Sequence, residues 1–179
     1  QKRTEQMLRL EHKVARSLAA ADDAGGGLRM VIQAVCQAEH WACGRYFVAD
    51  DTAGLLRFQD GWSIDEPAFE QFVQGSRELI YKHGEGLGGL VWDSGEPVWS
   101  ADVRSAPRVH LKTLPGSMVT GIRGVFAFPV IAGSKTIGVL NFSSPLVRQP
   151  DKRLLQAARV IGSQVGQFLQ RKQAEESLR

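Results

Sequence analysis

Apolar side chains recur at intervals of three and four residues through the first twenty positions, with charged side chains between them. The members of this stripe are Met7, Leu10, Val14 and Leu18. Their spacing predicts an amphipathic helix. The triple glycine at 25–27 is interpreted as a flexible break, after which a second, more buried helix is expected to end near His40.

The pattern then changes to short runs rich in aromatic and β-branched residues. The runs CGRYFVADD (43–51) and GLLRFQDGWSI (54–64) predict a hairpin, and Pro67 marks the expected start of a third helix. The run PVWSADV (97–103) predicts a short strand. The clearest hairpin consists of RGVFAFPVIAG (123–133) and KTIGVLNFSS (135–144).

One long helix is predicted from Asp151 onward, with Asp151 at the N-cap or in the first turn. Its apolar residues follow a 4-3-4-3 spacing at Leu154, Ala158, Ile161, Val165 and Phe168. Strands joined by hairpins imply an antiparallel sheet, and the helices need a sheet face to pack on. The predicted fold class is therefore α+β.

Composition and charge exclude several classes of partner. The 179 residues suffice for one domain with a single core, and no apolar run reaches the roughly 18 residues of a membrane span, so we expect no membrane insertion. The net charge of +3 comes from the ends, because residues 21–150 hold 11 basic and 14 acidic residues. A nucleic-acid partner is not expected, since binding would need a basic face on the domain itself.

Candidate chemistry is sparse along the chain. The glycines of GEGLGG (84–89) satisfy GxGxxG, but the two turns available before Gly95 and Pro97 are too short for a dinucleotide-binding helix. We interpret them as a structural turn. The four histidines lack metal-ligand spacing, and no nucleophile elbow or Walker loop is present. Cys36 and Cys43 are interpreted as buried thiols in a reducing compartment, which predicts a cytoplasmic location.

The segment VWDSGEPVWSADVRSAPRVH (91–110) combines aromatic and polar residues in the longest irregular stretch. Two interpretations stay open. In the first, the aromatic residues belong to the core and the polar groups cap turns. In the second, the segment crosses the sheet and covers a small-molecule cavity. On the second interpretation we predict these lining residues: Trp99, Asp102, Val103, His110, Arg123, Phe126 and Phe128. Strand alternation puts the two phenylalanines on one face.

The stretches GEGLGGLVWDSGEPVWSADV (84–103) and GVFAFPVIAGSKTIGVLNFSS (124–144) together resemble the GAF domain. The shared features are a glycine-marked short helix, a Gly-Glu-Pro turn, a strand ending in Asp-Val, and a hairpin whose second strand reads IGVLNF. The resemblance spans roughly residues 25–170. It implies an antiparallel sheet of five or six strands with helices on both faces, and a cavity that binds small molecules or chromophores in many members.

The resemblance also removes some functions. Bilin-binding members often carry a cysteine where Val109 precedes His110, so no covalent bilin is expected. The cyclic-nucleotide signature is absent, and two helix-side thiols do not supply the reactive cysteines of the methionine sulfoxide reductase members. A noncovalent ligand of unknown identity stays open.

The two ends, KRTEQMLR (2–9) and KQAEESLR (172–179), resemble each other and the connectors between modules of bacterial sensor kinases and cyclic-dinucleotide signalling proteins. The resemblance implies an incoming linker helix over 1–24, a sensory core over 25–150 and an outgoing signalling helix over 151–179. We expect flanking PAS or GAF modules and an output domain in the full-length protein.

The leading hypothesis is a non-catalytic cytoplasmic sensory module of a signalling system such as a two-component system. The alternative is an unliganded dimerisation spacer. The sensor hypothesis would be favoured by a void lined by Trp92, Trp99, Phe126 and Phe128. The spacer hypothesis would be favoured if these four rings packed on one another. A parallel homodimer is predicted through Leu10, Val14, Leu154, Ala158, Ile161, Val165 and Phe168.

Overall fold

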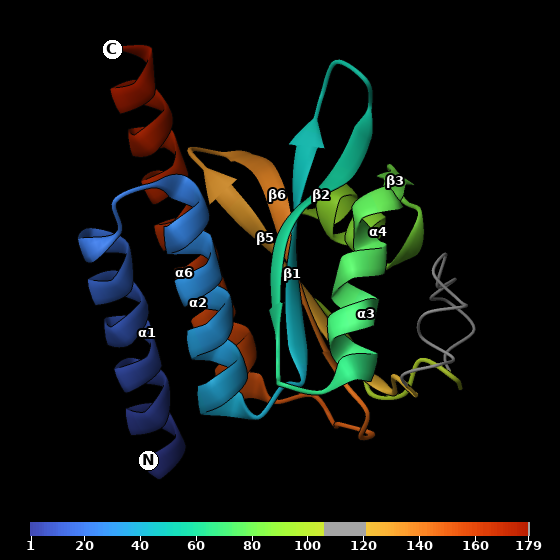
Figure 1. Ribbon diagram of the computed structural model, residues 1–179. Coiled ribbons are helices and arrows are strands. Elements are labelled where there is room, and N and C mark those ends of the chain that lie inside the picture. Colours follow the sequence, from blue (N-terminus) through green and yellow to red (C-terminus); the bar gives the residue numbers. More distant parts are fainter. Residues whose placement is uncertain (106–120, 179) are drawn as a thin grey trace.

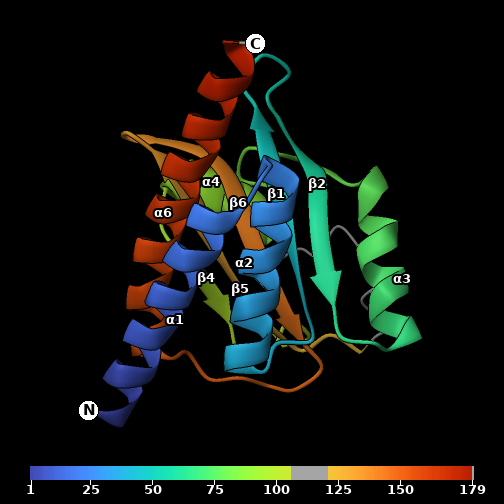
Figure 2. The same cartoon turned by 60° about the vertical axis from the view of Figure 1, so that its left-hand side comes forward.

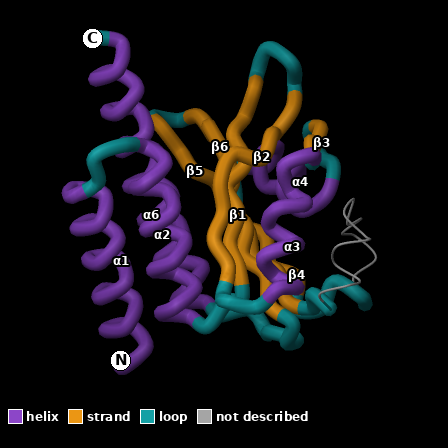
Figure 3. Tube along the Cα trace, viewed as in Figure 1, coloured by secondary structure: helices purple, strands orange, loops and turns teal. Residues whose placement is uncertain are grey.

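The computed structural model describes residues 1–105 and 121–178. A central β-sheet separates two layers of helices (Figure 1, Figure 3). Two long helices pack on one face, α2 (Ala24–Glu39) and α6 (Lys152–Ser177), and a third, α1 (Lys2–Ala20), packs on both of them. Two short helices lie on the other face, α3 (Pro67–Gly75) and α4 (Gly86–Ser94), and a 3-10 turn, η1 (Ser76–Glu78), follows α3. The α+β prediction, with long terminal helices, is confirmed.

The sheet contains six strands in the order β3-β2-β1-β6-β5-β4, and every neighbouring pair is antiparallel. Their bounds are β1 (Cys43–Asp50), β2 (Leu55–Ser63), β3 (Ile80–Lys82), β4 (Val98–Ser100), β5 (Gly124–Ala132) and β6 (Lys135–Ser144). Both predicted hairpins are present, as β1-β2 and β5-β6. The short strand β3 and its pairing with β2 were not predicted.

The predicted flexible break at the triple glycine is wrong, because residues 25–27 belong to the first turn of α2. Asp23 caps this helix and accepts a 2.6 Å hydrogen bond from the backbone N–H of Gly26. Gly27 lies so close to the ring of Phe168 that an added Cβ would collide with it. Gly27 therefore lets α2 approach α6, and the chain reverses direction just before the three glycines (Figure 2).

Helix α6 lies directly on the backbone of β5. A Cβ at Gly162 would collide with the carbonyl oxygen of Pro129, and a Cβ at Gly166 with that of Ile131. Both glycines are buried. Larger side chains at these two positions would hold the helix away from the strand.

The glycine-rich turn before α4 is structural, as expected. Gly84 and Gly86 have positive φ angles of 72° and 66°, which side-chain-bearing residues rarely adopt. A Cβ at Gly89 would collide with the carbonyl oxygen of Lys82. Helix α4 spans nine residues, so the long helix that a dinucleotide site requires is absent here.

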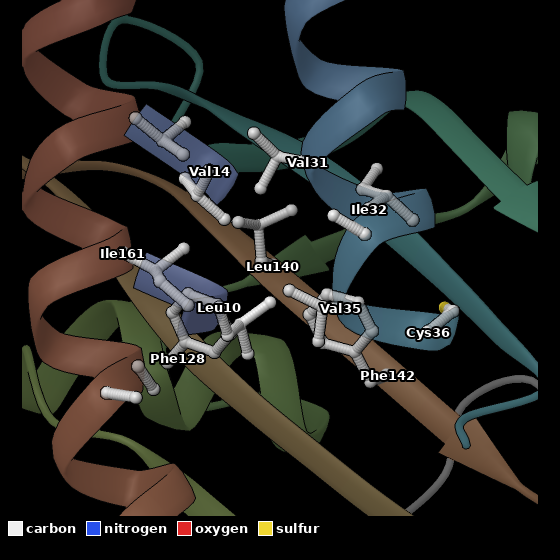
Figure 4. Close-up of a cluster of buried hydrophobic side chains, with 14 of the residues drawn as sticks. Leu10, Val14, Val31, Ile32, Val35, Cys36, Phe128, Leu140, Phe142 and Ile161 are labelled. Carbon is white, nitrogen blue, oxygen red and sulfur yellow. The ribbon is translucent and has the colours of Figure 1, made fainter. Parts of the chain in front are cut away.

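Each face of the sheet carries its own hydrophobic core. Figure 4 shows the core beneath α1, α2 and α6, where residues from all three helices meet β5 and β6. The opposite core fills the space beneath α3 and α4 and includes Phe47, Leu56, Phe72, Val91 and Val139. Because both faces are covered, β5 and β6 are buried over nearly their whole length.

A cluster of three charged side chains joins the beginnings of α1 and α6 to the end of α2. Arg3 donates to Glu39 and to Asp151, with Nη1–Oε2 and Nε–Oδ2 distances of 2.9 Å each. The second oxygen of Asp151 caps α6, because it accepts from the N–H groups of Arg153 and Leu154. Partial burial opposes a low pKa at Asp151, but the hydrogen bonds from Leu154 and Arg3 outweigh it and lower the pKa.

None of the helices in the described ranges is both long and apolar enough to cross a membrane.

Candidate functional site

Three aromatic residues of the predicted pocket lie in the filled core beneath the long helices. Phe126 and Phe128 share a face of β5, as predicted, but it is the face that α6 covers. Their ring centroids are 5.3 Å apart, and Trp99 lies 4.8 Å from Phe126. The indole N–H of Trp99 donates to the carbonyl oxygen of Arg148 at 2.7 Å. These rings pack on one another beneath the long helices, and their role as ligand contacts stays a prediction.

Trp92 is separated from the other three rings by the sheet. It belongs to the core beneath α3 and α4, and its ring stacks on His83 with centroids 3.4 Å apart. His83 Nδ1 lies 2.6 Å from a carboxylate oxygen of Asp93. The four aromatic residues therefore neither enclose one cavity nor form one cluster.

The carboxylate of Asp102 forms an ion pair with Arg123, which lies just before β5. The Arg123 guanidinium donates to both carboxylate oxygens, with an Nε–Oδ1 distance of 2.8 Å. This pairing, helped by the backbone N–H of Arg104, lowers the pKa of Asp102 to about 2. The pair ties the end of the β4 segment to the start of β5. Val103 packs in the α3/α4 core, and His110 and Val109 lie outside the described residues.

The face of the sheet beneath α3 and α4 carries a row of polar side chains that the sequence did not single out. Arg45 of β1 lies opposite Asn141 of β6, and Asn141 lies opposite Ala127 of β5. Ser100 of β4 lies opposite Val125. Val98 is the β4 residue in register with Ala127, so Ser100 lies on the same face but two residues along the strand from the line through Arg45 and Asn141. The surrounding floor is apolar, formed by Val125, Ala127 and Val139.

Arg45 is the most unusual member of this row, because only 4% of its surface is exposed. Its Nη1 donates to the Ser76 hydroxyl at 3.0 Å, and that hydroxyl donates to the carbonyl oxygen of Phe72. The guanidinium carbon lies 4.5 Å from the ring centroid of Phe72 and 5.2 Å from that of Phe47. The Nε–H has no hydrogen-bond partner in the part of the chain that the structure describes.

Two further polar atoms on this face have no hydrogen-bond partner within residues 1–105 and 121–178. They are the amide oxygen of Asn141 and the hydroxyl of Ser100, and both side chains are buried. Buried polar groups are nearly always hydrogen-bonded, since each unmade bond costs about 1–3 kcal/mol. One cationic donor, one amide acceptor and one hydroxyl on an apolar floor are groups suited to a small polar molecule.

The predicted dimer residues all lie within the core of the chain itself. Leu10 and Val14 of α1 pack against α2 and α6, and the other five lie on the buried face of α6 in the same core. A second copy cannot reach these side chains while both helices stay docked, so this interface assignment is corrected. Homodimerisation itself stays a prediction and would need another surface.

The two cysteines are free, buried thiols, as predicted. Burial raises the pKa of Cys43 to about 11, and burial together with the nearby Cys43 raises the pKa of Cys36 further. Neither is a thiolate near neutral pH. Within residues 1–105 and 121–178, no group of three or more His, Cys, Asp and Glu side chains could hold a metal ion.

The sequence model of the GAF domain family matches residues 27–170. This chain belongs to the GAF domain family. The matched range includes most of α6. GAF domains are common small-molecule-binding sensory modules.

Solved GAF structures share this fold at low identity. The GAF domain of a phosphoenolpyruvate-protein phosphotransferase from Coxiella burnetii is 19% identical, with a TM-score of 0.82 over 97% of this chain and 98% of its own. The nlh2 GAF domain of A. aeolicus in an inactive state is 18% identical, with a TM-score of 0.73 over 95% and 99%. No curated protein matches the sequence.

Enzymes also occur among the neighbours. The free methionine-R-sulfoxide reductase of Neisseria meningitidis, solved with its substrate, is 15% identical, with a TM-score of 0.75 over 94% of this chain and 91% of its own. At this identity the likeness shows the fold alone.

Sequence reasoning missed Arg45 and Asn141, although a signal was present. Each is a strongly polar residue inside an otherwise apolar strand, in CGRYFVAD and in KTIGVLNFSS. A central strand that is covered on both faces rarely carries such a residue without a partner. Their juxtaposition depends on the register between β1 and β6, which the sequence does not specify.

Proposed function

We propose that this domain is a non-catalytic sensory module that binds a small molecule on the α3/α4 face of the sheet. The observation that supports this most strongly is that Arg45, Asn141 and Ser100 share this face and each has a buried polar atom with no hydrogen-bond partner among the described residues. A domain with a purely structural role gains nothing from such groups, because apolar residues of similar size would pack there at lower cost. A bound molecule would supply their missing hydrogen bonds.

A route for the signal runs through the sheet to the long helices. Asn141 faces the proposed site, while its neighbours Leu140 and Phe142 face the core beneath α1, α2 and α6. Strand β5 pairs with β6 and contacts α6 through its backbone. Ligand contacts that shift β5 or β6 would therefore change the packing of α6.

The proposed output lies outside this chain, in a domain such as a sensor kinase, with flanking modules joined through α1 and α6. The Coxiella structure supports a modular arrangement, since it is described as one domain of a phosphotransferase. The buried free thiols support a reducing, cytoplasmic location.

An unliganded spacer is the second candidate. The observation that favours it is the filled core around Trp99, Phe126 and Phe128, where a void was expected for a sensor. An enzyme of the reductase type is disfavoured by the raised pKa values of both cysteines.

Native mass spectrometry of protein purified from its own host tests the proposal. A retained small molecule, together with ligand-dependent changes in hydrogen exchange along β6 and α6, is the expected result. Protein that carries no bound mass, and that no metabolite stabilises in thermal-shift assays, would support the spacer instead.

A further inference from the structure

Two charged side chains are buried in the described part of the chain, Glu39 and Arg45, and they differ in whether they have an ion-pair partner. Glu39 is 5% exposed and accepts hydrogen bonds from Arg3 on both carboxylate oxygens. Arg45 has no ion pair with any residue in the described ranges. A buried charge that is left without a counterion is strongly unfavourable.

The contacts that Arg45 makes compensate only part of its lost hydration. A guanidinium offers five N–H donors, and the described partners are one hydroxyl, from Ser76, and the faces of two phenyl rings. Aromatic faces stabilise a cation, but they do not replace a charge-assisted hydrogen bond. The Nε–H has no acceptor among the described residues.

The remaining segment of the chain cannot supply the missing carboxylate. Residues 106–120 contain no aspartate and no glutamate. Several acidic groups of the described chain are already paired with other cations, including Asp60 with Arg29, Asp102 with Arg123 and Asp50 with Arg57. No ion pair within residues 1–105 and 121–178 includes Arg45, so an anion bound from outside the chain is a counterion that this position can still accept.

We propose that the ligand of this domain carries an oxyanion, a carboxylate or a phosphate, that pairs with the guanidinium of Arg45. This inference rests on the proposed small-molecule function and names the chemical class of its ligand. An oxyanion accepts two parallel N–H bonds from a guanidinium, and this geometry makes arginine the preferred partner for carboxylate and phosphate.

The neighbouring groups restrict the ligand further. The orphan amide oxygen of Asn141 lies on the strand next to Arg45 and can only accept, so the ligand has to present an N–H or O–H group there. Ser100 lies two strands beyond Asn141 and can donate or accept. The class that fits is a small hydroxy acid, amino acid or phosphate ester, with its anionic end at β1.

Arg45→Met is the decisive variant, because it removes the charge and keeps most of the side-chain length. Arg57→Met is the matched control, since Arg57 is an exposed arginine on the adjacent strand β2. Arg45→Lys keeps the charge but loses the bidentate geometry. The probes are L-malate with its neutral diamide, and glycerol 3-phosphate with glycerol. These pairs distinguish a carboxylate from a phosphate and an anion from its neutral counterpart.

The expected result is that the wild type binds an anionic member of one pair and not its neutral counterpart. Affinity for that probe falls roughly 10- to 100-fold in Arg45→Met and stays within about twofold in Arg57→Met. Without ligand, Arg45→Met melts at the same temperature as the wild type or higher. Native mass spectra of protein from its host lose the bound mass in this variant. If Arg45→Met does not fold, Arg45→Lys is expected to weaken binding about tenfold.

Two opposing outcomes are distinguishable. A probe or co-purified molecule that binds Arg45→Met as tightly as the wild type, or a neutral probe that binds as tightly as its anion, overturns the oxyanion assignment and leaves the small-molecule function standing. Absence of any co-purified mass, together with no binding of any of the four probes, overturns both.

Discussion

Replacing Arg3 by methionine tests whether the ion cluster at the start of α1 holds this helix on the domain. The substitution leaves Glu39 buried at 5% exposure without its cationic partner, and it leaves Asp151 with its helix-capping bonds alone. Breaking a fully buried ion pair from one side costs about 3–5 kcal/mol. Because Arg3 is 33% exposed, solvent reduces this cost. We expect the free energy of unfolding to fall by about 2 kcal/mol.

Two variants serve as controls for this prediction. Arg9→Met removes an arginine from the same helix that is 76% exposed and lies 3.9 Å from Glu5, so its expected effect is below about 0.5 kcal/mol. Arg3→Met combined with Glu39→Gln removes both charges of the buried pair. This double variant is expected to recover most of the lost stability, since no uncompensated carboxylate remains.

Urea denaturation followed by tryptophan fluorescence measures these differences, and hydrogen exchange along α1 locates them. A loss of about 2 kcal/mol corresponds to a fall in Tm of about 4–8 °C for a chain of this size. The reasoning would be refuted if Arg3→Met and Arg9→Met had equal stability, or if Glu39→Gln did not restore what Arg3→Met lost.

Three further predictions follow from other parts of the structure. Gly166→Ala is expected to destabilise the protein by about 1–3 kcal/mol despite the better helix propensity of alanine, while Gln167→Ala on the exposed face of α6 is near neutral, as measured by chemical denaturation. The pKa of Asp102 lies near 2 in the folded state, below its ordinary value, so its ion pair stabilises the protein above about pH 4 and is lost as pH falls toward 2; Asp102→Asn should flatten the Tm profile in that window, and an unchanged profile would argue against the pair. Cys36 and Cys43 should react with a thiol reagent at pH 8 only after unfolding, and rapid modification of the native protein would contradict their burial.

The fold could be predicted from the sequence wherever local pattern and tertiary environment agree. The two hairpins were predicted from strand-like runs on either side of a turn, and α6 from an apolar stripe that matches its one buried face. Asp151 caps α6 as expected. The triple glycine was misread, because a helix propensity argument takes no account of the close approach of α2 to Phe168. That approach becomes visible only when two helices far apart in sequence are packed together.

The candidate site could be predicted only in part, for a geometric reason. Strand alternation correctly placed Phe126 and Phe128 on one side of β5, but it does not say which side faces α6. On β5 both sides are apolar, because Val125 and Ala127 alternate with Phe126 and Phe128. The apolar stripe of α6 that includes Ile161 and Val165 does not indicate its packing partner either. A stripe that packs on its own sheet and a stripe that pairs with a second copy have the same residue spacing.

The contact between α6 and β5 determines how stiffly the two are joined. An interface made of interdigitating side chains can absorb a small displacement, because rotamers change before the backbones move. At Gly162 and Gly166 no side chain stands between the helix and the carbonyl oxygens of the strand. A displacement of β5 toward the long helices therefore has no soft element to compress and is passed on as a rigid-body movement of α6. The direct backbone contact at this glycine pair therefore couples the movement of the strand tightly to that of the helix.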